Sequence, residues 1–249
     1  QYVLATAVVF GAVGTIVQHF RYDASSDTIG DSFEGLDQVR RDLRDMPEEL
    51  RPLLVGDTLV RFANGMVYVF FVLVVTRFLS VGLETTIAAG GFSYALDLSP
   101  EAFFGYLLGV EMLIALLVMA PAAKAAEHVG LKPVVALGFA VYATFPIMLI
   151  NTPESTLALI LVFAFSGLRF AGLPSHKALI VGPAEQDTGG RVTGTYYLLR
   201  NTVVIPSAAV GGYLWDSVSP EIAFTVASVV GLVGTGYFLL FGREFDAYR

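Results

Sequence analysis

Two ionisable residues lie near the middle of long apolar segments, where a charged side chain is costly. Glu111 lies ten residues into the segment that starts near Glu101, and Arg169 lies about fourteen residues into the segment 155–179. Along a helix that rises 1.5 Å per residue, each is roughly 15–20 Å from the end of its segment, near the midplane of a bilayer core about 30 Å thick. A charge at that depth costs at least about 2.5–3.5 kcal/mol unless it faces a partner or a water-filled cavity.

This depth makes both residues candidates for a functional site. Glu111 is suited to binding a proton or a sodium ion during transport, because a carboxyl group changes its proton affinity between dry and wet surroundings. Arg169 is suited to binding an anionic solute. The alternative for both is a structural ion pair in which Arg169 neutralises Glu111.

Two more polar residues in apolar segments are candidate contacts for a solute. Asn64 lies near the start of the second apolar segment, where a polar side chain needs a partner or a cavity. Arg200 lies about eight residues inside the sixth, so it either contacts a solute or extends its charge to the membrane surface. Three prolines also fall inside apolar segments and predict kinks; they are Pro146, Pro174 and Pro206.

Residues for enzymatic chemistry are scarce. The sequence contains no cysteine, which excludes disulfides, thiolate metal sites and cysteine nucleophiles. No nucleotide-binding, metalloprotease or serine-hydrolase motif is present, and the three histidines are far apart along the chain, at His19, His128 and His176. We therefore expect no enzymatic activity, no cofactor and no metal.

The composition is that of a membrane protein. Of 249 residues, 55% are hydrophobic and only 15% are charged, and the mean hydropathy is +0.68. These values exclude an ordinary soluble globular enzyme. The formal net charge of −7 excludes the basic surface of a nucleic-acid-binding protein.

Seven segments are long and apolar enough to cross a bilayer as helices. The breaks between them carry Pro, Gly, Asn or charged residues, as helix ends do. We therefore predict an all-α fold, a polytopic membrane helical bundle with seven transmembrane helices. The predicted spans are 2–20, 58–80, 101–122, 133–150, 155–179, 192–214 and 221–241.

The distribution of basic residues predicts the orientation in the cell membrane. Lys and Arg are abundant in 21–61, 121–133, 183–191 and 242–249, and they are absent from the alternate segments 81–100, 151–154 and 215–220. Basic residues near helix ends are retained on the cytoplasmic side. The linker 21–57 and the C-terminus are therefore predicted to be cytoplasmic, and residue 1 to lie outside.

The number of predicted spans is odd, the first span starts outside, and residue 1 is Gln. We therefore expect that the sequence lacks the N-terminal part of the protein. We expect helix 2–20 to be the last span of a missing N-terminal half and 21–57 to be a cytoplasmic linker. The six helices in 58–241 then form a C-terminal half, followed by a tail at 242–249.

The linker contains an amphipathic helix pattern. Apolar residues recur at spacings of three and four with charged residues between them, and Pro47 is expected to break the helix in two. The apolar positions are Leu36, Val39, Leu43, Met46, Leu50 and Leu53. This helix is either a regulatory or membrane-surface element, or a tether that covers apolar surface.

Two cytoplasmic loops carry a family resemblance. In 123–133, Glu127, Gly130 and Lys132 match the acidic, glycine and last basic positions of G-x-L-x-D-R-x-G-R-K, the signature loop of the major facilitator superfamily. The sequence departs from that pattern at Ala123, Ala125, His128 and Leu131.

The second loop, 183–196, resembles the P-x-E-x-R-G-R-x-x-G-x-Y element that joins the corresponding helices in many members of that superfamily. Gly189 and Gly190 allow a tight turn, Arg191 lies where it can reach the end of the preceding helix, and Gly194 permits close packing. Further along, 211–216 resembles the G-G-x-L-W-D that closes the same helix.

The resemblance covers roughly 58–241 and implies a secondary transporter that works by alternating access. Its expected partners are the lipid bilayer, a small-molecule solute, protons or sodium ions, and the missing N-terminal half, with no nucleic acid. The acidic, lysine-poor composition is similar to that of proteins from extremely halophilic archaea. One rival hypothesis is a seven-helix receptor or sensor without transport activity. Another, a membrane-embedded transferase or lipid-handling enzyme, requires clustered carboxylates or histidines that the sequence lacks.

Overall fold

The computed structural model describes residues 2–22, 35–44, 46–89, 92–182 and 189–244. The chain divides into two units, 1–38 and 39–249. The first unit consists mainly of helix α1 (Tyr2–Arg21), whose described side chains are all exposed.

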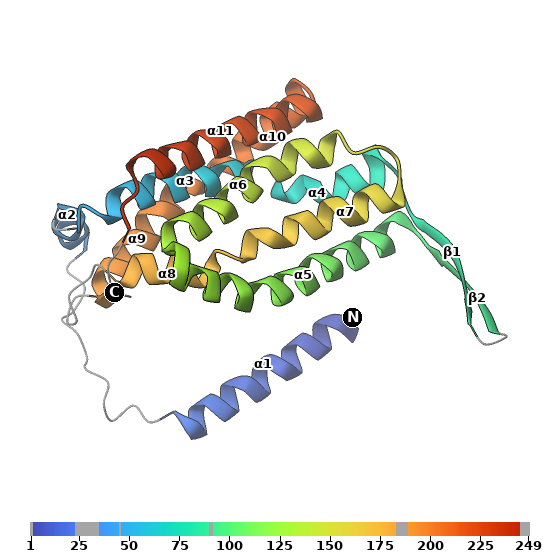
Figure 1. Cartoon of the computed structure of the whole chain (residues 1–249), viewed down its shortest axis with the longest axis horizontal. Helices are drawn as coiled ribbons and strands as arrows, with labels where there is room; N and C mark the ends of the chain where they lie inside the picture. The colour runs from blue at the N-terminus through green and yellow to red at the C-terminus, as the bar shows by residue number, and fades with distance from the viewer. Residues whose placement is uncertain (1, 23–34, 45, 90–91, 183–188, 245–249) are drawn as a thin grey trace. The chain divides into compact units, whose positions relative to one another are not determined.

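The second unit is a bundle of helices that carries one β-hairpin (Figure 1). Helix α11 packs along α3 and α6, and α5 packs along α7. Helix α2 spans the boundary between the units. The elements are α2 (Leu36–Arg44), α3 (Leu50–Val67), η2 (Tyr68–Phe70), α4 (Phe71–Leu73), the π-helical η3 (Val74–Phe78), β1 (Leu83–Ala89), β2 (Phe92–Leu98), α5 (Pro100–Val129), α6 (Leu131–Ile150), α7 (Thr156–Gly167), η4 (Leu168–Phe170), α8 (Leu173–Val181), α9 (Gly189–Val204), α10 (Ser207–Ser217) and α11 (Pro220–Phe241).

Five helical segments among the described residues are long and apolar enough to cross a membrane: Leu50–Phe78, Pro100–Val129, Leu131–Ile150, Thr156–Val181 and Pro220–Phe241. The length and hydropathy of these helices are therefore compatible with a protein that crosses a membrane several times. Two of the seven predicted spans are not among them. One corresponds to α1, and the other, 192–214, is divided into α9 with 16 residues and α10 with 11. The division falls at Pro206, which has no N–H to continue the helix.

The first span of the bundle begins earlier than the sequence predicts. Helix α3 starts at Leu50 instead of residue 58, so 50–57 belong to the first helical segment long and apolar enough to cross a membrane, and not to the linker. Pro52 is tolerated because it lies in the first helical turn, where backbone N–H groups have no helical acceptor. Pro47 lies between α2 and α3, where a break was expected.

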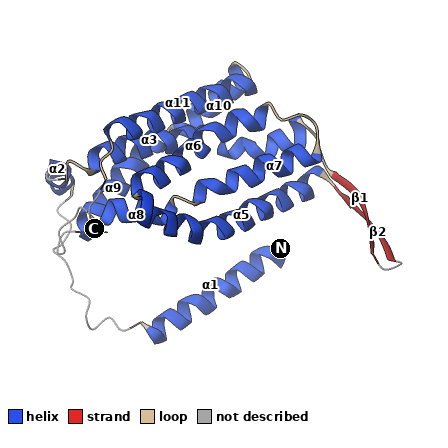
Figure 2. Cartoon of the chain, in the orientation of Figure 1, coloured by secondary structure: helices blue, strands red, loops and turns tan. Residues whose placement is uncertain are grey.

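The prediction of an all-α fold is wrong for the segment between Leu50–Phe78 and Pro100–Val129. Strands 83–89 and 92–98 pair in antiparallel fashion, with Leu83 opposite Leu98 and Thr85 opposite Leu96, and this hairpin projects beyond the helices (Figure 2). A period-2 pattern of β-branched and aromatic residues favours extended structure. The sequence analysis predicted only a connection between two helices here.

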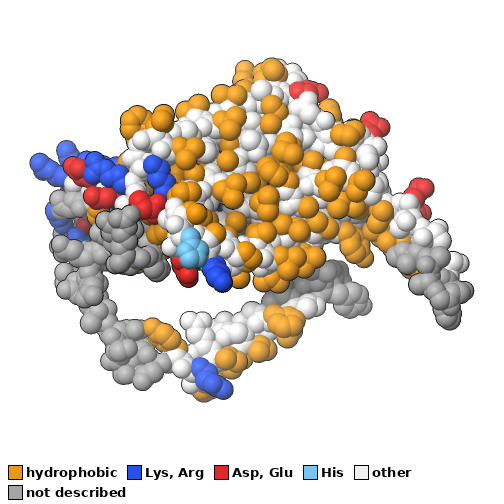
Figure 3. Space-filling model, in the orientation of Figure 1, with side chains coloured by type: hydrophobic (Ala, Val, Ile, Leu, Met, Phe, Trp, Pro, Cys, Tyr) orange, Lys and Arg blue, Asp and Glu red, His pale blue; other side chains and the backbone are white. Residues whose placement is uncertain are grey.

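Apolar side chains cover most of the bundle face drawn in Figure 3, whereas Lys and Arg gather at the end where α2 lies. Leu116 on α5 and Leu240 on α11 are 71% and 78% exposed. An apolar surface of this extent is expected to face lipid.

Close helix contact depends on small residues at particular positions. A methyl group at Gly211 of α10 would overlap the backbone carbonyl of Met66 on α3. At Gly236 of α11, in contrast, the same methyl group would meet nothing within 4 Å.

We expect Gly211→Ala to lower the free energy of unfolding by about 1–3 kcal/mol, because the helices must separate to admit the methyl group. The matched variant Gly236→Ala should be neutral, or more stable by up to about 1 kcal/mol, since alanine favours the helix. Thermal unfolding of the purified variants in detergent measures both. Equal effects at the two positions would contradict the packing described here.

Candidate functional site

The first buried charge cluster joins α5 to the break between α7 and α8. Nη2 of Arg169 lies 2.7 Å from Oε1 of Glu111, and the Ser166 hydroxyl donates a hydrogen bond to the same oxygen. Glu111 is 2% exposed and Arg169 is 8% exposed. The two predicted site residues are therefore brought together as an ion pair in the interior.

A local interruption of the helix positions Arg169. Helix α7 ends at Gly167, the next three residues form the 3-10 turn η4, and α8 begins at Leu173. A Cβ on Gly167 would lie 2.7 Å from the carbonyl oxygen of Glu111, and one on Gly172 would lie 2.8 Å from that of Val134. Glycine at these two positions lets the interrupted helix approach α5 and α6 closely.

Aromatic rings surround the Arg169 guanidinium. Its central carbon lies 5.0 Å from the ring centres of Tyr142 and Phe170, and 5.9 Å from that of Phe145. The faces of such rings attract cations. Glu111 contacts only one nitrogen of the Arg169 guanidinium, Nη2. The other two, Nε and Nη1, are buried without a hydrogen-bond partner among the described residues.

The second charge cluster is centred on Asp57, which is fully buried on α3. Its Oδ1 accepts a hydrogen bond from Nε of Arg61 at 3.2 Å. Its Oδ2 accepts hydrogen bonds from Nη1 of Arg200 and the hydroxyl of Tyr196, both at 3.0 Å. Nε2 of His176 lies 3.2 Å from the same oxygen. One carboxylate therefore holds α3, α8 and α9 together.

Asp57 was missed by the sequence analysis because it was assigned to the linker. A signal was present, since Asp57 and Arg61 are four residues apart, the spacing at which opposite charges pair on one helix face. The side chains of Arg61 and His176 both turn inward, toward Asp57.

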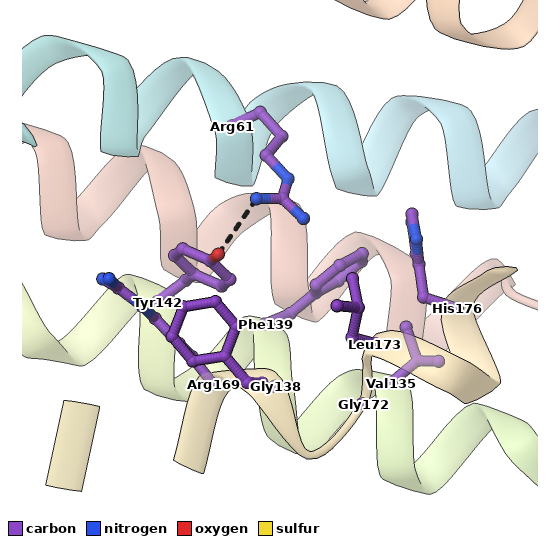
Figure 4. A pocket seen from close by; sticks show the side chains of 10 residues that line it. Arg61, Val135, Gly138, Phe139, Tyr142, Arg169, Gly172, Leu173 and His176 are labelled. Carbon is purple, nitrogen blue, oxygen red and sulfur yellow. Dashed lines mark hydrogen bonds between the residues drawn. The ribbon is translucent and has the colours of Figure 1, made fainter. Parts of the chain in front are cut away.

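The two clusters meet at a cavity of about 20 Å³. Its lining includes Arg61 and His176 from the Asp57 cluster and Arg169 from the Glu111 cluster. Tyr142 of α6 lies between them: its hydroxyl accepts a hydrogen bond from Nη1 of Arg61 at 3.0 Å (Figure 4). Tyr142 is a second residue that the sequence analysis missed, because an aromatic residue in an apolar helix carries no distinguishing signal.

The other two predicted solute contacts lie elsewhere. Arg200 belongs to the Asp57 cluster, where its side chain is 15% exposed, and its guanidinium carbon lies 4.6 Å from the ring centre of Tyr197. Asn64 is half-buried on α3 and does not line the cavity.

The first signature loop forms a compact junction between α5 and α6. Gly130 has a φ of +91°, which favours glycine. The Glu244 carboxylate accepts hydrogen bonds from the backbone N–H groups of Leu131 and Lys132, at 2.6 and 3.1 Å. Glu127 is exposed and lines a separate cavity of about 160 Å³.

The second loop is described only from residue 189, because 183–188 lie outside the described residues. Gly190 and Gly194 are both exposed, and a Cβ at either position would meet nothing within 4 Å. Gly194 thus has no close neighbour among the described residues, and its role in close packing stays a prediction.

Arg191 connects this loop to the linker helix. Its Nη2 donates a hydrogen bond to the buried Asp42 carboxylate of α2, which also accepts one from the Thr195 hydroxyl at 3.3 Å. Met46 and Leu50 beside α2 are buried in the core. The end of the linker thus covers apolar surface, as a tether does, although a regulatory role is compatible with the same contacts.

No group of three or more His, Cys, Asp or Glu side chains in the described part of the chain is placed to hold a metal ion. Comparison of the chain with protein-family models and with curated proteins gives no match. A functional assignment therefore depends on the buried charge clusters themselves.

We expect Asp57→Asn to destabilise the protein by about 3–5 kcal/mol, because it leaves the Arg61 and Arg200 guanidinium groups without a buried counter-charge. The control Asp216→Asn removes an exposed carboxylate on α10 and should stay within about 0.5 kcal/mol of wild type. Thermal unfolding in detergent, with size-exclusion chromatography to verify folding, measures both. A mild effect of Asp57→Asn would show that this carboxylate does not hold the three helices together.

Proposed function

We propose that the bundle is one half of a secondary transporter of the major facilitator type, which moves a small polar or anionic solute by alternating access. In this proposal 58–241, preceded by the early turns of α3, works against a second six-helix half. The linker and the C-terminus face the cytoplasm, in agreement with the basic residues at the α2 end of the bundle.

The observation that carries the proposal is the Glu111–Arg169 ion pair at a break in a membrane-spanning helix. Solute and ion sites of secondary transporters are typically formed by discontinuous helices near the middle of the membrane. Thr156–Val181 is such a helix, because η4 interrupts it and carries Arg169. Charges in this position are retained mainly where they serve a function or a specific pairing.

The pair also suggests how an ion gradient is coupled to solute movement. Glu111 neutralises Arg169 while it is ionised. A proton on Glu111 removes that negative charge and frees the guanidinium to bind an anionic or strongly polar solute. Binding of the proton and binding of the solute then favour each other, as proton-coupled uptake requires.

The transport proposal is tested with the protein expressed from its gene and reconstituted in liposomes that contain a pH-sensitive dye. Gradients of a panel of solutes are applied one at a time: amino acids, dicarboxylates, sugars, phosphate and nitrate. We expect at least one anionic or polar solute to drive a proton flux that protein-free liposomes do not show. The absence of both proton flux and solute exchange across the whole panel would overturn the proposal.

Coupling through Glu111 is tested with Glu111→Gln. We expect this variant to exchange solute across the membrane but to lose the dependence of net uptake on the proton gradient, because the amide cannot take up the proton. The matched control Glu154→Gln removes an exposed carboxylate in a loop and should behave as wild type. Full gradient dependence in Glu111→Gln would exclude Glu111 as the coupling residue while leaving transport itself in place.

A further inference from the structure

Three buried side-chain nitrogens in the described part of the chain lack a hydrogen-bond partner, and both residues that carry them line the same cavity. They are Nε and Nη1 of Arg169 and Nε2 of His176. A buried polar group without a partner is costly, and a charged one more so. Nε2 of His176 still lies 3.2 Å from Oδ2 of Asp57, whereas Nε and Nη1 of Arg169 have no acceptor among the described side chains. The wall of this cavity therefore needs an acceptor beside Arg169.

The charges around the cavity show which kind of acceptor is favoured. The two clusters contain three guanidinium groups, on Arg61, Arg169 and Arg200, but only two carboxylates, on Asp57 and Glu111. The guanidinium groups therefore exceed the carboxylates by one positive charge. Away from water such a charge is poorly screened, so an anion is favoured over a neutral molecule.

Tyr142 brings two of these positive charges together. The guanidinium carbons of Arg61 and Arg169 lie 4.8 and 5.0 Å from the centre of its ring. Figure 4 shows the two side chains reaching Tyr142 from different segments of the chain. The ring attracts each cation, but it does not cancel their mutual repulsion. A negative charge beside Tyr142 would do so.

The size of the cavity limits the ligand. About 20 Å³ is enough for roughly one water-sized particle. The remaining lining is largely apolar, with Phe139, Phe170 and Leu173 among its residues. A compact single-atom anion suits a space of this size and lining better than the larger carboxylate, phosphate or sulfate groups.

We propose that this cavity is a binding site for a halide ion, such as chloride, held by the free nitrogens of Arg169 and by the positive field of Arg61. The proposal goes beyond transport of a solute, because halide binding to the resting protein requires no transport. Its test therefore uses a binding measurement that stays informative if the transport proposal fails.

The experiment measures the unfolding temperature of the purified, full-length protein in nanodiscs. Gluconate, an anion too large for the cavity, is replaced stepwise by bromide at constant ionic strength. We expect a saturable rise of the unfolding temperature with bromide concentration, because a ligand that binds only the folded state stabilises it. Bromide also scatters X-rays anomalously, so diffraction from bromide-soaked crystals should place a peak beside Arg169.

The double variant Glu111→Gln with Arg169→Gln removes the ion pair but keeps two amides that can hydrogen-bond to each other. We expect it to lose the bromide-dependent rise. The matched control Arg77→Gln, which removes an exposed guanidinium, should keep it. Should the double variant fail to fold, Tyr142→Phe is the second test: it removes the hydroxyl that positions Arg61, and we expect half-saturation at about tenfold higher bromide concentration.

Equal unfolding temperatures in bromide and gluconate would overturn the proposal and assign the cavity to water. A rise that persists unchanged in the double variant or in Tyr142→Phe would place the bromide effect elsewhere and would also overturn it. Anomalous peaks confined to the protein surface would also overturn the proposal.

Discussion

The need to pair charges inside an apolar bundle is the constraint on which the arrangement of these helices depends. Burial of an unpaired charge costs several kcal/mol, and loss of one partner leaves that cost uncompensated. Asp57 is fully buried and meets groups from α8 and α9, while Glu111 of α5 meets Arg169 of η4. Hydrogen bonds and ion pairs depend on direction, so these contacts add a constraint on the register of the helices to the one that apolar packing provides.

Interruptions of the helices place the charges where they can pair. An uninterrupted helix through 156–181 would give Arg169 only the directions that helical geometry permits. The 3-10 turn η4, followed by the first turn of α8 with Pro174, changes that path. Close approach of the backbones at Gly167 and Gly172 then brings Arg169 within reach of Glu111. Broken helix, small residues and buried charge thus form one structural unit, and this unit supports the proposal of a transport site better than any of its parts would.

The sequence predicted this architecture to the extent that hydropathy and depth determine it. Apolar length identified the five helical segments that, among the described residues, are long and apolar enough to cross a membrane, together with two further spans that are not among them. Depth identified Glu111 and Arg169, which the structure pairs. Asp57 was missed because it lies near the end of a span, where sequence alone does not distinguish a solvated carboxylate from a buried one. The hairpin of β1 and β2 was missed because hydropathy identifies only the apolar segments, and 81–100 lies between two of them. Pro206 predicted a kink, yet only the structure shows that α9 and α10 become separate helices.

Contact between the two charge clusters gives the site a property that neither has alone. Arg61 bonds Asp57 and Tyr142, and the ring of Tyr142 also lies beside Arg169, which pairs with Glu111. If one of these linked side chains gains or loses a charge, the electric field at the others changes, because the buried surroundings screen the charge weakly. In the proposed coupling, a proton on Glu111 would therefore act on Asp57 as well as on Arg169, and so on the carboxylate that joins α3, α8 and α9. The proposed coupling of an ion to helix movement requires such a link, and the side chains of Arg61, Tyr142 and Arg169 connect the two carboxylates here.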